Sequence, residues 1–374
     1  KQGLVCMGLL LVLSSCHTGK QITASGLQRK DFQTEVNGQH TDLFTLSNKQ
    51  GMEVCITNYG ARVVSILVPD RNGKRKDVVC GFSTITEYME QRQNFGSTVG
   101  RYIGRILNAR FTLDGVEYKL VPNNGKSGHI SHGGNPGFAD RIWKVEQADT
   151  HRVCLSYLSP DGENGFPGNL KVTLVYSLGE DDNALDLTYE ATTDAPTVLN
   201  LSHHSFFNIS GNFTKSVEDQ QLWVDADRFT PYDDKKCVTG EYLQVAGTPL
   251  DFRMPHAIGE CIDADHPQLK VVNGYDHTWE LNTKGDDTRP AAWVYDPASG
   301  RKMEIFTTEP GMQIYTGNGL KGKMTGKGGI AYPFRSAVCF ETMHFQDSPN
   351  QPGFPSTVLR PGEVFRSHTV YKFE

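Results

Sequence analysis

Several features that mark common classes of protein are missing from this sequence of 374 residues. None of its eight cysteines forms a CxxC or other close pair, so a structural zinc site is not expected. There is no basic stripe and the formal net charge is -6, which argues against nucleic acid as the main partner. Internal repeats are absent, and few windows show helical periodicity, with Ser83–Gln91 as the best short candidate. Hydrophobic residues make up 37%, so a folded core is expected rather than disorder.

Long apolar runs are also missing, and the longest one stands at the beginning of the chain. Leu4–Leu13 is too short to span a bilayer, which needs about 20 residues, but it suits the core of a signal peptide. It leads into Ser14-Ser15-Cys16, and small residues before a cysteine resemble a bacterial lipobox. We therefore expect residues 1–15 to be a signal peptide of lipoprotein type and residues 16–30 to be a tether. An ordinary signal peptide with a chance cysteine is the alternative.

If Cys16 carries a lipid, the protein is exported and membrane-anchored, and it faces the periplasm. Contact with the membrane is then expected only through the lipid anchor.

The rest of the chain alternates between short runs rich in Val, Ile, Thr, Phe and Tyr and turns rich in Gly, Pro, Asn and Asp. This spacing predicts an all-β protein in which residues 31–374 form a single large antiparallel β-sandwich domain. Lys321–Gly329 has few apolar residues and is expected to be a mobile loop. The expected strands include Met52–Asn58, Arg62–Pro69, Phe111–Leu120, Leu170–Leu178, Ala184–Glu190, Thr197–Ile209, Met303–Thr308 and Met312–Asn318.

One expected strand, Thr197–Ile209, has a polar face that could form the floor of a binding site. If the segment is extended, its side chains alternate between two faces. One face is mainly apolar, and the other carries Asn200, Ser202, His204 and Asn208. His204 is therefore the functional candidate of this strand, whereas its neighbour His203 is expected to be a packed, structural histidine.

Glu341 interrupts a run that is apolar on both sides, Ala337–Phe345. Because burying an unpaired carboxylate is costly, either this end of the strand is exposed or Glu341 points into a functional cleft. A carboxylate in such surroundings is a reasonable candidate for a general base.

Four further polar residues are candidates for holding a ligand. Asp276 and Gln313 stand beside aromatic residues, a combination that suits the apolar face and hydroxyl rim of a sugar. His132 and Arg105 lie in segments flanked by glycine, where the backbone can approach a ligand closely. Taken singly, each is equally typical of a half-exposed strand or of a loop.

At these residues the sequence resembles the aldose 1-epimerase (galactose mutarotase) family. The resemblance runs from about Phe44 to Phe373 and rests on seven motifs in the family's order. These are VGRYIGRILNARFTLDGVEYKL, SHGG, SPDGENGFPGNL, LNLSHHSFFNI, GYDHTW, PGMQIYTGN and FETMHFQDSPNQPGFPS. The resemblance implies the family's large β-sandwich and the interconversion of the α and β anomers of a free hexose, with no cofactor or metal.

Carried over to the matching positions, the resemblance also implies roles for individual residues. Glu341 would be the general base for the anomeric hydroxyl, and His204 the general acid for the ring oxygen. His132 would hydrogen-bond near these atoms. The remaining hydroxyls would be held by Arg105, Asp276 and Gln313.

The sequence departs from the family's pattern at four positions. Gly104 replaces the usual Asn, so one sugar hydrogen bond is missing or is supplied elsewhere. His203 replaces Asn, Met343 replaces Gln, and Gln346 replaces Pro. These departures bear on the sugar preference more than on the reaction.

Three other functions stay open at this point. A glycoside hydrolase could use Glu341 and Asp276 as its two carboxylates. A non-catalytic sugar-binding lipoprotein would not need an acid–base pair, and a phosphosugar epimerase would not be expected outside the cytosol. The expected partner is a small-molecule monosaccharide substrate, and the protein itself is expected to be a monomer or a dimer.

Overall fold

The computed structural model describes residues 21–374. The predicted signal peptide and the lipidation site at Cys16 lie outside these residues. Among the described residues, no helix has both the length and the apolar character that crossing a membrane requires.

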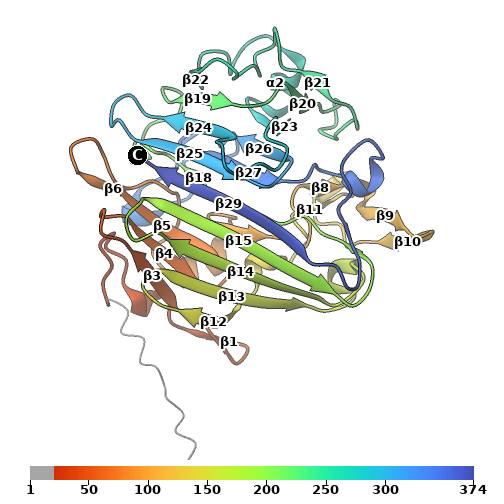
Figure 1. The fold of residues 1–374 in the computed structure, drawn as a ribbon, viewed down its shortest axis with the longest axis horizontal. Coiled ribbons are helices and arrows are strands. Elements are labelled where there is room, and N and C mark those ends of the chain that lie inside the picture. Colours follow the sequence, from red (N-terminus) through yellow and green to blue (C-terminus); the bar gives the residue numbers. More distant parts are fainter. Residues whose placement is uncertain (1–20) are drawn as a thin grey trace, which may run out of the picture.

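The first layer of the fold is a nine-stranded antiparallel sheet that crosses the whole molecule (Figure 1). Within it, β14 pairs with β15 from Leu170–Thr193 to Leu178–Leu185 without a bulge. Along β14 the side chains alternate between two faces. Leu170, Val172 and Leu174 on one face are fully buried, while the residues on the other face, mostly polar, are half-buried or exposed. In spatial order the strands are β12 (Lys144–Ala148), β13 (Arg152–Ser159), β14 (Leu170–Leu178), β15 (Ala184–Thr193), β29 (Phe365–Phe373), β25 (Lys302–Thr307), β24 (Ala292–Tyr295), β19 (Gln221–Val224) and β22 (His256–Ala257).

The second layer consists of a six-stranded and a four-stranded sheet, both antiparallel. The six-stranded sheet has the order β18 (Phe206–Phe207), β27 (Val338–Met343), β26 (Gly311–Tyr315), β23 (Asp276–Glu280), β20 (Arg228–Thr230) and β21 (Leu243–Gln244). The four-stranded sheet has the order β3 (Leu43–Ser47), β4 (Glu53–Thr57), β5 (Arg62–Pro69) and β6 (Arg75–Asp77).

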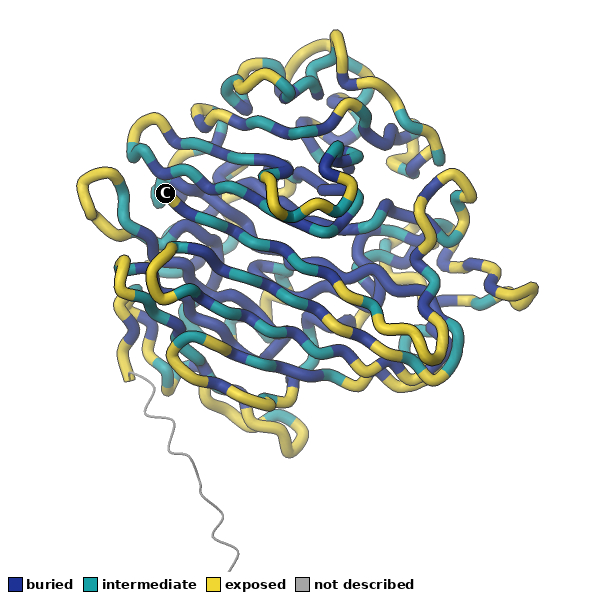
Figure 2. Tube along the Cα trace, viewed as in Figure 1, coloured by how far each residue is buried: buried dark blue, intermediate teal, exposed yellow. Residues whose placement is uncertain are grey.

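The largest hydrophobic core joins these layers, because it contains residues of all three sheets, such as Val63 of β5, Leu187 of β15 and Ile314 of β26. Fully burying one such side chain contributes about 1.5–3 kcal/mol. Figure 2 shows buried residues running along the strands of the sandwich and exposed ones gathered in the connecting loops. The prediction of a large antiparallel β-sandwich is confirmed.

The remaining elements are short. Helix α1 (Ile85–Gln91) confirms the predicted helix and begins with a capping box, in which Thr84 and Glu87 satisfy each other's backbone N–H groups. The second helix is α2 (Pro267–Val272). Five two-stranded pairs complete the strands: β1 (Glu35–Val36) with β2 (Gln39–His40), β7 (Ser97–Val99) with β17 (Ser202–His204), β8 (Arg105–Ile106) with β11 (Ile130–Ser131), β9 (Arg110–Leu113) with β10 (Val116–Lys119), and β16 (Thr197–Val198) with β28 (Val358–Leu359).

The segment Thr197–Ile209, predicted as one strand, is instead divided among β16, β17 and β18, which belong to three different sheets. All of its residues are buried, including the polar ones. The prediction of a single strand was therefore wrong, because the alternation of polar and apolar residues here does not separate solvent from core. In this segment the apolar side chains face the hydrophobic core, and most of the polar side chains face a pocket or make buried hydrogen bonds.

The described part of the predicted tether, residues 21–30, packs against the sandwich. The carboxylate of Glu53 accepts hydrogen bonds from the backbone N–H groups of Ala24 and Ser25, at 3.0 and 3.1 Å. Leu27 is buried in a second hydrophobic cluster. Because these residues are held by buried contacts, the packed domain begins before residue 31.

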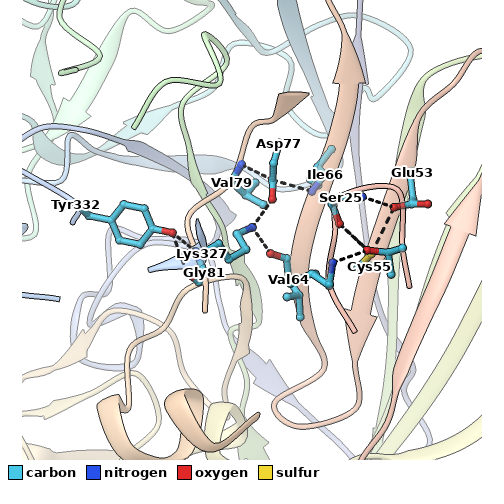
Figure 3. A network of polar contacts seen from close by, with 12 residues as sticks. Ser25, Glu53, Cys55, Val64, Ile66, Asp77, Val79, Gly81, Lys327 and Tyr332 are labelled. Atoms are coloured by element: carbon cyan, nitrogen blue, oxygen red, sulfur yellow. Dashed lines mark hydrogen bonds and ion pairs between the residues drawn. The ribbon is translucent and has the colours of Figure 1, made fainter. Parts of the chain in front are cut away.

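The loop Lys321–Gly329 is anchored rather than free. The Nζ atom of Lys327 lies 2.6 Å from Asp77 Oδ2 and also donates to the carbonyl oxygen of Val64. Close by, the hydroxyl of Tyr332 donates to the carbonyl oxygen of Gly81 (Figure 3). A lysine in a run with few apolar residues can thus still reach buried acceptors, and the mobility of the loop stays a prediction.

Candidate active site

A pocket of about 260 Å³ brings together all six residues that the sequence predicts to bind or act on a sugar. These are Arg105, His132, His204, Asp276, Gln313 and Glu341. The pocket is also lined by Gln93, Asn94, Gly104, Ser131, Phe206, Tyr315, Met343 and Gln346.

Three neighbouring strands of the six-stranded sheet position the acidic and amide side chains. Gln313 of β26 is paired directly with Glu341 of β27. On the other side of β26, Gln313 is paired with Thr278 of β23, and Asp276 lies two residues before Thr278. Because residues two apart on a strand point to the same face, Asp276, Gln313 and Glu341 all project from one face of the sheet.

His204 approaches Glu341 from a different sheet. Its Nε2 atom lies 3.3 Å from Oε1 of Glu341, and both side chains are almost fully buried, with 7% and 5% exposed. Burial raises the pKa of Glu341 well above its ordinary value, and the nearby Asp276 carboxylate raises it further. Burial also lowers the pKa of His204 well below its ordinary value, with His132 adding to the effect. Both shifts disfavour the charged form of the group concerned.

Phe206 supports the histidine and supplies an apolar wall. Its ring is stacked on the imidazole of His204, with centroids 5.0 Å apart and planes inclined by 14°. Such stacking fixes the plane of the imidazole without a charged partner. Phe206 is not among the residues predicted from the sequence, since an aromatic residue among buried hydrophobic neighbours gives no signal of a site.

His132 lies at the rim of the pocket in a left-handed backbone conformation, with φ of 52°. Its ring stands edge-on to His204, with centroids 5.5 Å apart. Nδ1 accepts a hydrogen bond from the backbone N–H of Gly104 at 3.4 Å, which leaves Nε2 to carry the proton. Burial and the charge of Arg105 lower the pKa of His132 to about 4. The ring is therefore a neutral hydrogen-bond donor near pH 7.

Asp276 and Gln313 form a hydrogen-bonded pair in one wall of the pocket. Nε2 of Gln313 donates to Oδ1 of Asp276 at 2.6 Å, and Oε1 of Gln313 accepts from the hydroxyl of Thr278 at 2.5 Å. Burial raises the pKa of Asp276, while Arg105 opposes this shift. For Arg105 itself, burial acts to lower the pKa, but Tyr232 and Asp276 outweigh burial and raise it. This wall thus combines the cation of Arg105 with the hydrogen-bonding groups of Asp276 and Gln313.

His203 does not line the pocket, which confirms its predicted structural role. It is 2% exposed, its Nε2 atom lies 2.6 Å from the hydroxyl of Ser205, and its Nδ1 atom lies 3.4 Å from the hydroxyl of Tyr176. Two adjacent histidines therefore have separate tasks, since consecutive residues of β17 point to opposite faces.

A metal ion could be held by one set of side chains in the described part of the chain. The ligand atoms of His204, Cys339 and Glu341 all lie within 4.8 Å of one another. Since two of them are the candidate acid–base pair, a bound metal would occupy the groups that would otherwise move protons. The arrangement therefore suits proton transfer to and from a small polyhydroxylated ligand.

Several known proteins are similar to this chain in sequence and in fold. The family model described as "Aldose 1-epimerase" matches residues 42–372. The chain is 40% identical to galactose mutarotase from Bos taurus, over 88% of this chain and 93% of that protein. It is 36% identical to aldose 1-epimerase from Escherichia coli (strain K12), over 90% of this chain and 96% of that protein. A crystal structure of a GalM/aldose epimerase homologue from C. elegans has a TM-score of 0.82 and 31% identity, covering 89% of this chain and 99% of the other.

Proposed function

Because the chain belongs to the aldose 1-epimerase family and interconverts the anomers of aldoses, we propose that Glu341 and His204 make the two proton transfers of this reaction. The proposed substrate is a free hexose of the glucose or galactose type. The observation that carries the assignment is the contact of 3.3 Å between a carboxyl group and an imidazole, both buried and both lining one pocket.

The reaction needs one base and one acid at the same time. Ring opening breaks the bond between the anomeric carbon C1 and the ring oxygen O5, and the O1 hydroxyl becomes the carbonyl of an aldehyde. Glu341 takes the proton from O1 while His204 gives a proton to O5. Rotation about the C1–C2 bond presents the other face of the carbonyl, and reclosure returns both protons. Each well-placed proton transfer typically contributes roughly 10²–10⁴-fold.

The electrostatics of the pocket support this cycle. Before ring opening, the proposed roles require an ionised Glu341 and a protonated His204. After ring opening, the carboxyl group is neutral and so is the imidazole. The raised pKa of Glu341 and the lowered pKa of His204 both favour the second arrangement. The pocket is therefore expected to stabilise the proton arrangement that accompanies the open-chain aldehyde, which is the high-energy species of the reaction.

The other polar residues are proposed to hold the sugar. Arg105, Asp276 and Gln313 offer a cation, an anion and an amide along one wall, and hydroxyl groups can pair with all three. His132 offers a neutral N–H group beside His204, close to the reacting atoms. The ring of Phe206 offers an apolar surface for the carbon–hydrogen face of the sugar.

Polarimetry tests the proposal directly. Freshly dissolved α-glucose and α-galactose should reach their equilibrium rotation faster with purified protein, and the acceleration should disappear in Glu341→Gln. Glu117→Gln, an exposed glutamate on β10, is the matched control. An unchanged rate in folded Glu341→Gln would contradict the assigned base. Release of reducing ends from an oligosaccharide would instead support a glycoside hydrolase.

We also propose that the mature protein is a lipoprotein anchored through Cys16 on the periplasmic side of a membrane. The support is the short apolar run that ends in Ser14-Ser15-Cys16. Mass spectrometry of membrane-extracted protein should find a chain that begins at a lipid-modified Cys16. An intact N-terminus, or an unmodified cysteine, would contradict this proposal.

A further inference from the structure

Gln346 lines the same pocket, although it lies on the loop that follows β27 rather than on a strand. Only 4% of the residue is exposed. Its Nε2 atom donates to the hydroxyl of Tyr232 at 2.6 Å and to Oε1 of Gln313 at 3.3 Å. Its Oε1 atom accepts from Nη1 of Arg105 at 3.5 Å. The carboxamide of Gln346 therefore connects two residues that are proposed to hold the sugar.

The direction of every hydrogen bond in this chain follows from Arg105. A guanidinium group can only donate, so Gln346 must turn its oxygen toward Arg105. Its NH₂ group then faces Gln313, which must present its own oxygen in return. Gln313 is left with its NH₂ group toward the carboxylate of Asp276, at 2.6 Å. The chain thus fixes the orientation of the Gln346 amide and matches that of Gln313, which Asp276 and the hydroxyl of Thr278 also hold, at 2.6 and 2.5 Å. Removal of Gln346 would take away the link between Arg105 and Gln313.

Gly104 provides the space in which the side chain of Gln346 lies. A Cβ atom at position 104 would be 2.5 Å from Cγ of Gln346, closer than two such atoms can approach. The backbone of Gly104 also has a φ of 74°, which disfavours most other residues. A side chain at position 104 would therefore displace Gln346 and break its link between Arg105 and Gln313.

We infer that Gln346 determines substrate specificity, by accepting a hydrogen bond from one hydroxyl of the sugar while it positions Arg105 and Gln313. Its oxygen has only the long contact with Arg105, so it can accept from a hydroxyl that in turn accepts from the guanidinium group. The NH₂ group is already used by Tyr232 and Gln313. The Oε1 atom of Gln346 is therefore the atom left to accept from a free hydroxyl of the sugar. The inference rests on the proposed function.

The test combines variants of Gln346 with sugars that each lack one hydroxyl. Dissociation constants are measured by calorimetry for glucose and for its 2-, 3-, 4- and 6-deoxy analogues, and KM and kcat by polarimetry. The variants are Gln346→Ala and Gln346→Asn, with Gln147→Ala on the exposed strand β12 as the matched control. Gln346→Asn keeps the amide but is one methylene shorter, so it tests the reach of the side chain if the alanine variant does not fold.

Wild-type protein should bind one deoxy sugar roughly fivefold to tenfold more weakly than glucose, as expected for one lost hydrogen bond. Gln346→Ala and Gln346→Asn should bind glucose more weakly by a similar factor. In these variants, that one deoxy sugar should bind as tightly as glucose does, because the hydrogen bond that distinguishes the two sugars is already gone. KM should rise more than kcat falls. Gly104→Ala should weaken binding like Gln346→Ala, and the double variant should bind no more weakly than either single variant.

Two results would overturn the inference. One is a dissociation constant for glucose within twofold of wild type in both Gln346 variants. The other is a loss of affinity for the deoxy sugars that stays the same in the variants as in wild type. If wild-type protein binds sugars without accelerating mutarotation, the proposed acid–base function fails, while the dissociation constants still decide the role of Gln346.

Discussion

His204 and Glu341 meet at 3.3 Å although they lie on strands of two different sheets, β17 and β27. Their contact therefore depends on how the sheets are joined. The connection is short, because β18 begins two residues after His204 and pairs with β27 at Cys339. The same backbone that holds β18 in the six-stranded sheet thus fixes the imidazole against the carboxyl group.

Substitution of this pair should strongly lower kcat without unfolding the protein. Glu341→Gln keeps the shape of the side chain and removes its basicity, so kcat should fall by roughly 10²-fold or more. His204→Asn should have a similar effect. Since the two groups act as a unit, the double variant should lose far less than the product of the single losses. Stopped-flow polarimetry measures the rates, and thermal unfolding shows whether each variant is folded.

The pH dependence of kcat/KM should be bell-shaped, because the pair works only while it holds one proton. As the pH falls, His204 takes up a second proton, at a pKa below its ordinary value. As the pH rises, Glu341 loses the shared proton, at a pKa above its ordinary value. The alkaline limb should therefore disappear from the residual activity of Glu341→Gln, and the acid limb from that of His204→Asn. Identical profiles in wild type and both variants would show that other groups titrate.

The residues proposed to hold the sugar should affect binding more than chemistry. Alanine variants of Arg105, Asp276 and Gln313 should raise KM, and they should also lower kcat where the orientation of the sugar suffers. Arg105→Ala should have the largest effect, because it removes the cation that faces Asp276 and Gln346. Wild-type values of both constants in all three variants would place the sugar elsewhere.

Stability should depend on pH through His368 on β29, which lies between two carboxylates. Its ring nitrogens are 3.0 Å from Asp186 Oδ1 and 2.7 Å from Asp287 Oδ2. Hydrogen bonds to these carboxylates raise the pKa of His368 to about 9, against an ordinary value of about 6.5. The stabilisation is complete below pH 6.5 and is lost as the pH rises to about 9. The Tm of His368→Gln should therefore be lower than that of wild type at pH 6 and should approach it above pH 9.

The sequence was sufficient to predict the strand Leu170–Leu178, one face of which meets solvent. The bounds of Leu170–Leu178 agree with β14, because half of its residues are exposed or half-buried and the period of two is visible. In Thr197–Ile209 both faces are buried, and the same kind of alternation conceals two breaks between sheets. A pattern of polarity can show which residues avoid the hydrophobic core, but it cannot show what they contact instead.

The residues of the candidate site could be predicted from the sequence, but the contacts between them could not. The family resemblance selected six residues that all line one pocket. It marked Gly104 as a lost hydrogen-bonding group and Gln346 as a separate departure, with no sign that the two positions touch. The structure shows that a side chain at position 104 would collide with Gln346. The relation could not be predicted, because 241 residues separate the two positions and neither belongs to a periodic pattern.

The hydrogen bonds of Ala24 and Ser25 to Glu53 limit the length of the linker that would join the domain to a lipid anchor. From a lipid on Cys16 to the first residue fixed by Glu53 there are only eight steps of chain, which reach at most about 28 Å when fully extended. If Cys16 carries a lipid, Ala24 would therefore stay within about 28 Å of it, and the domain would be kept close to the membrane surface.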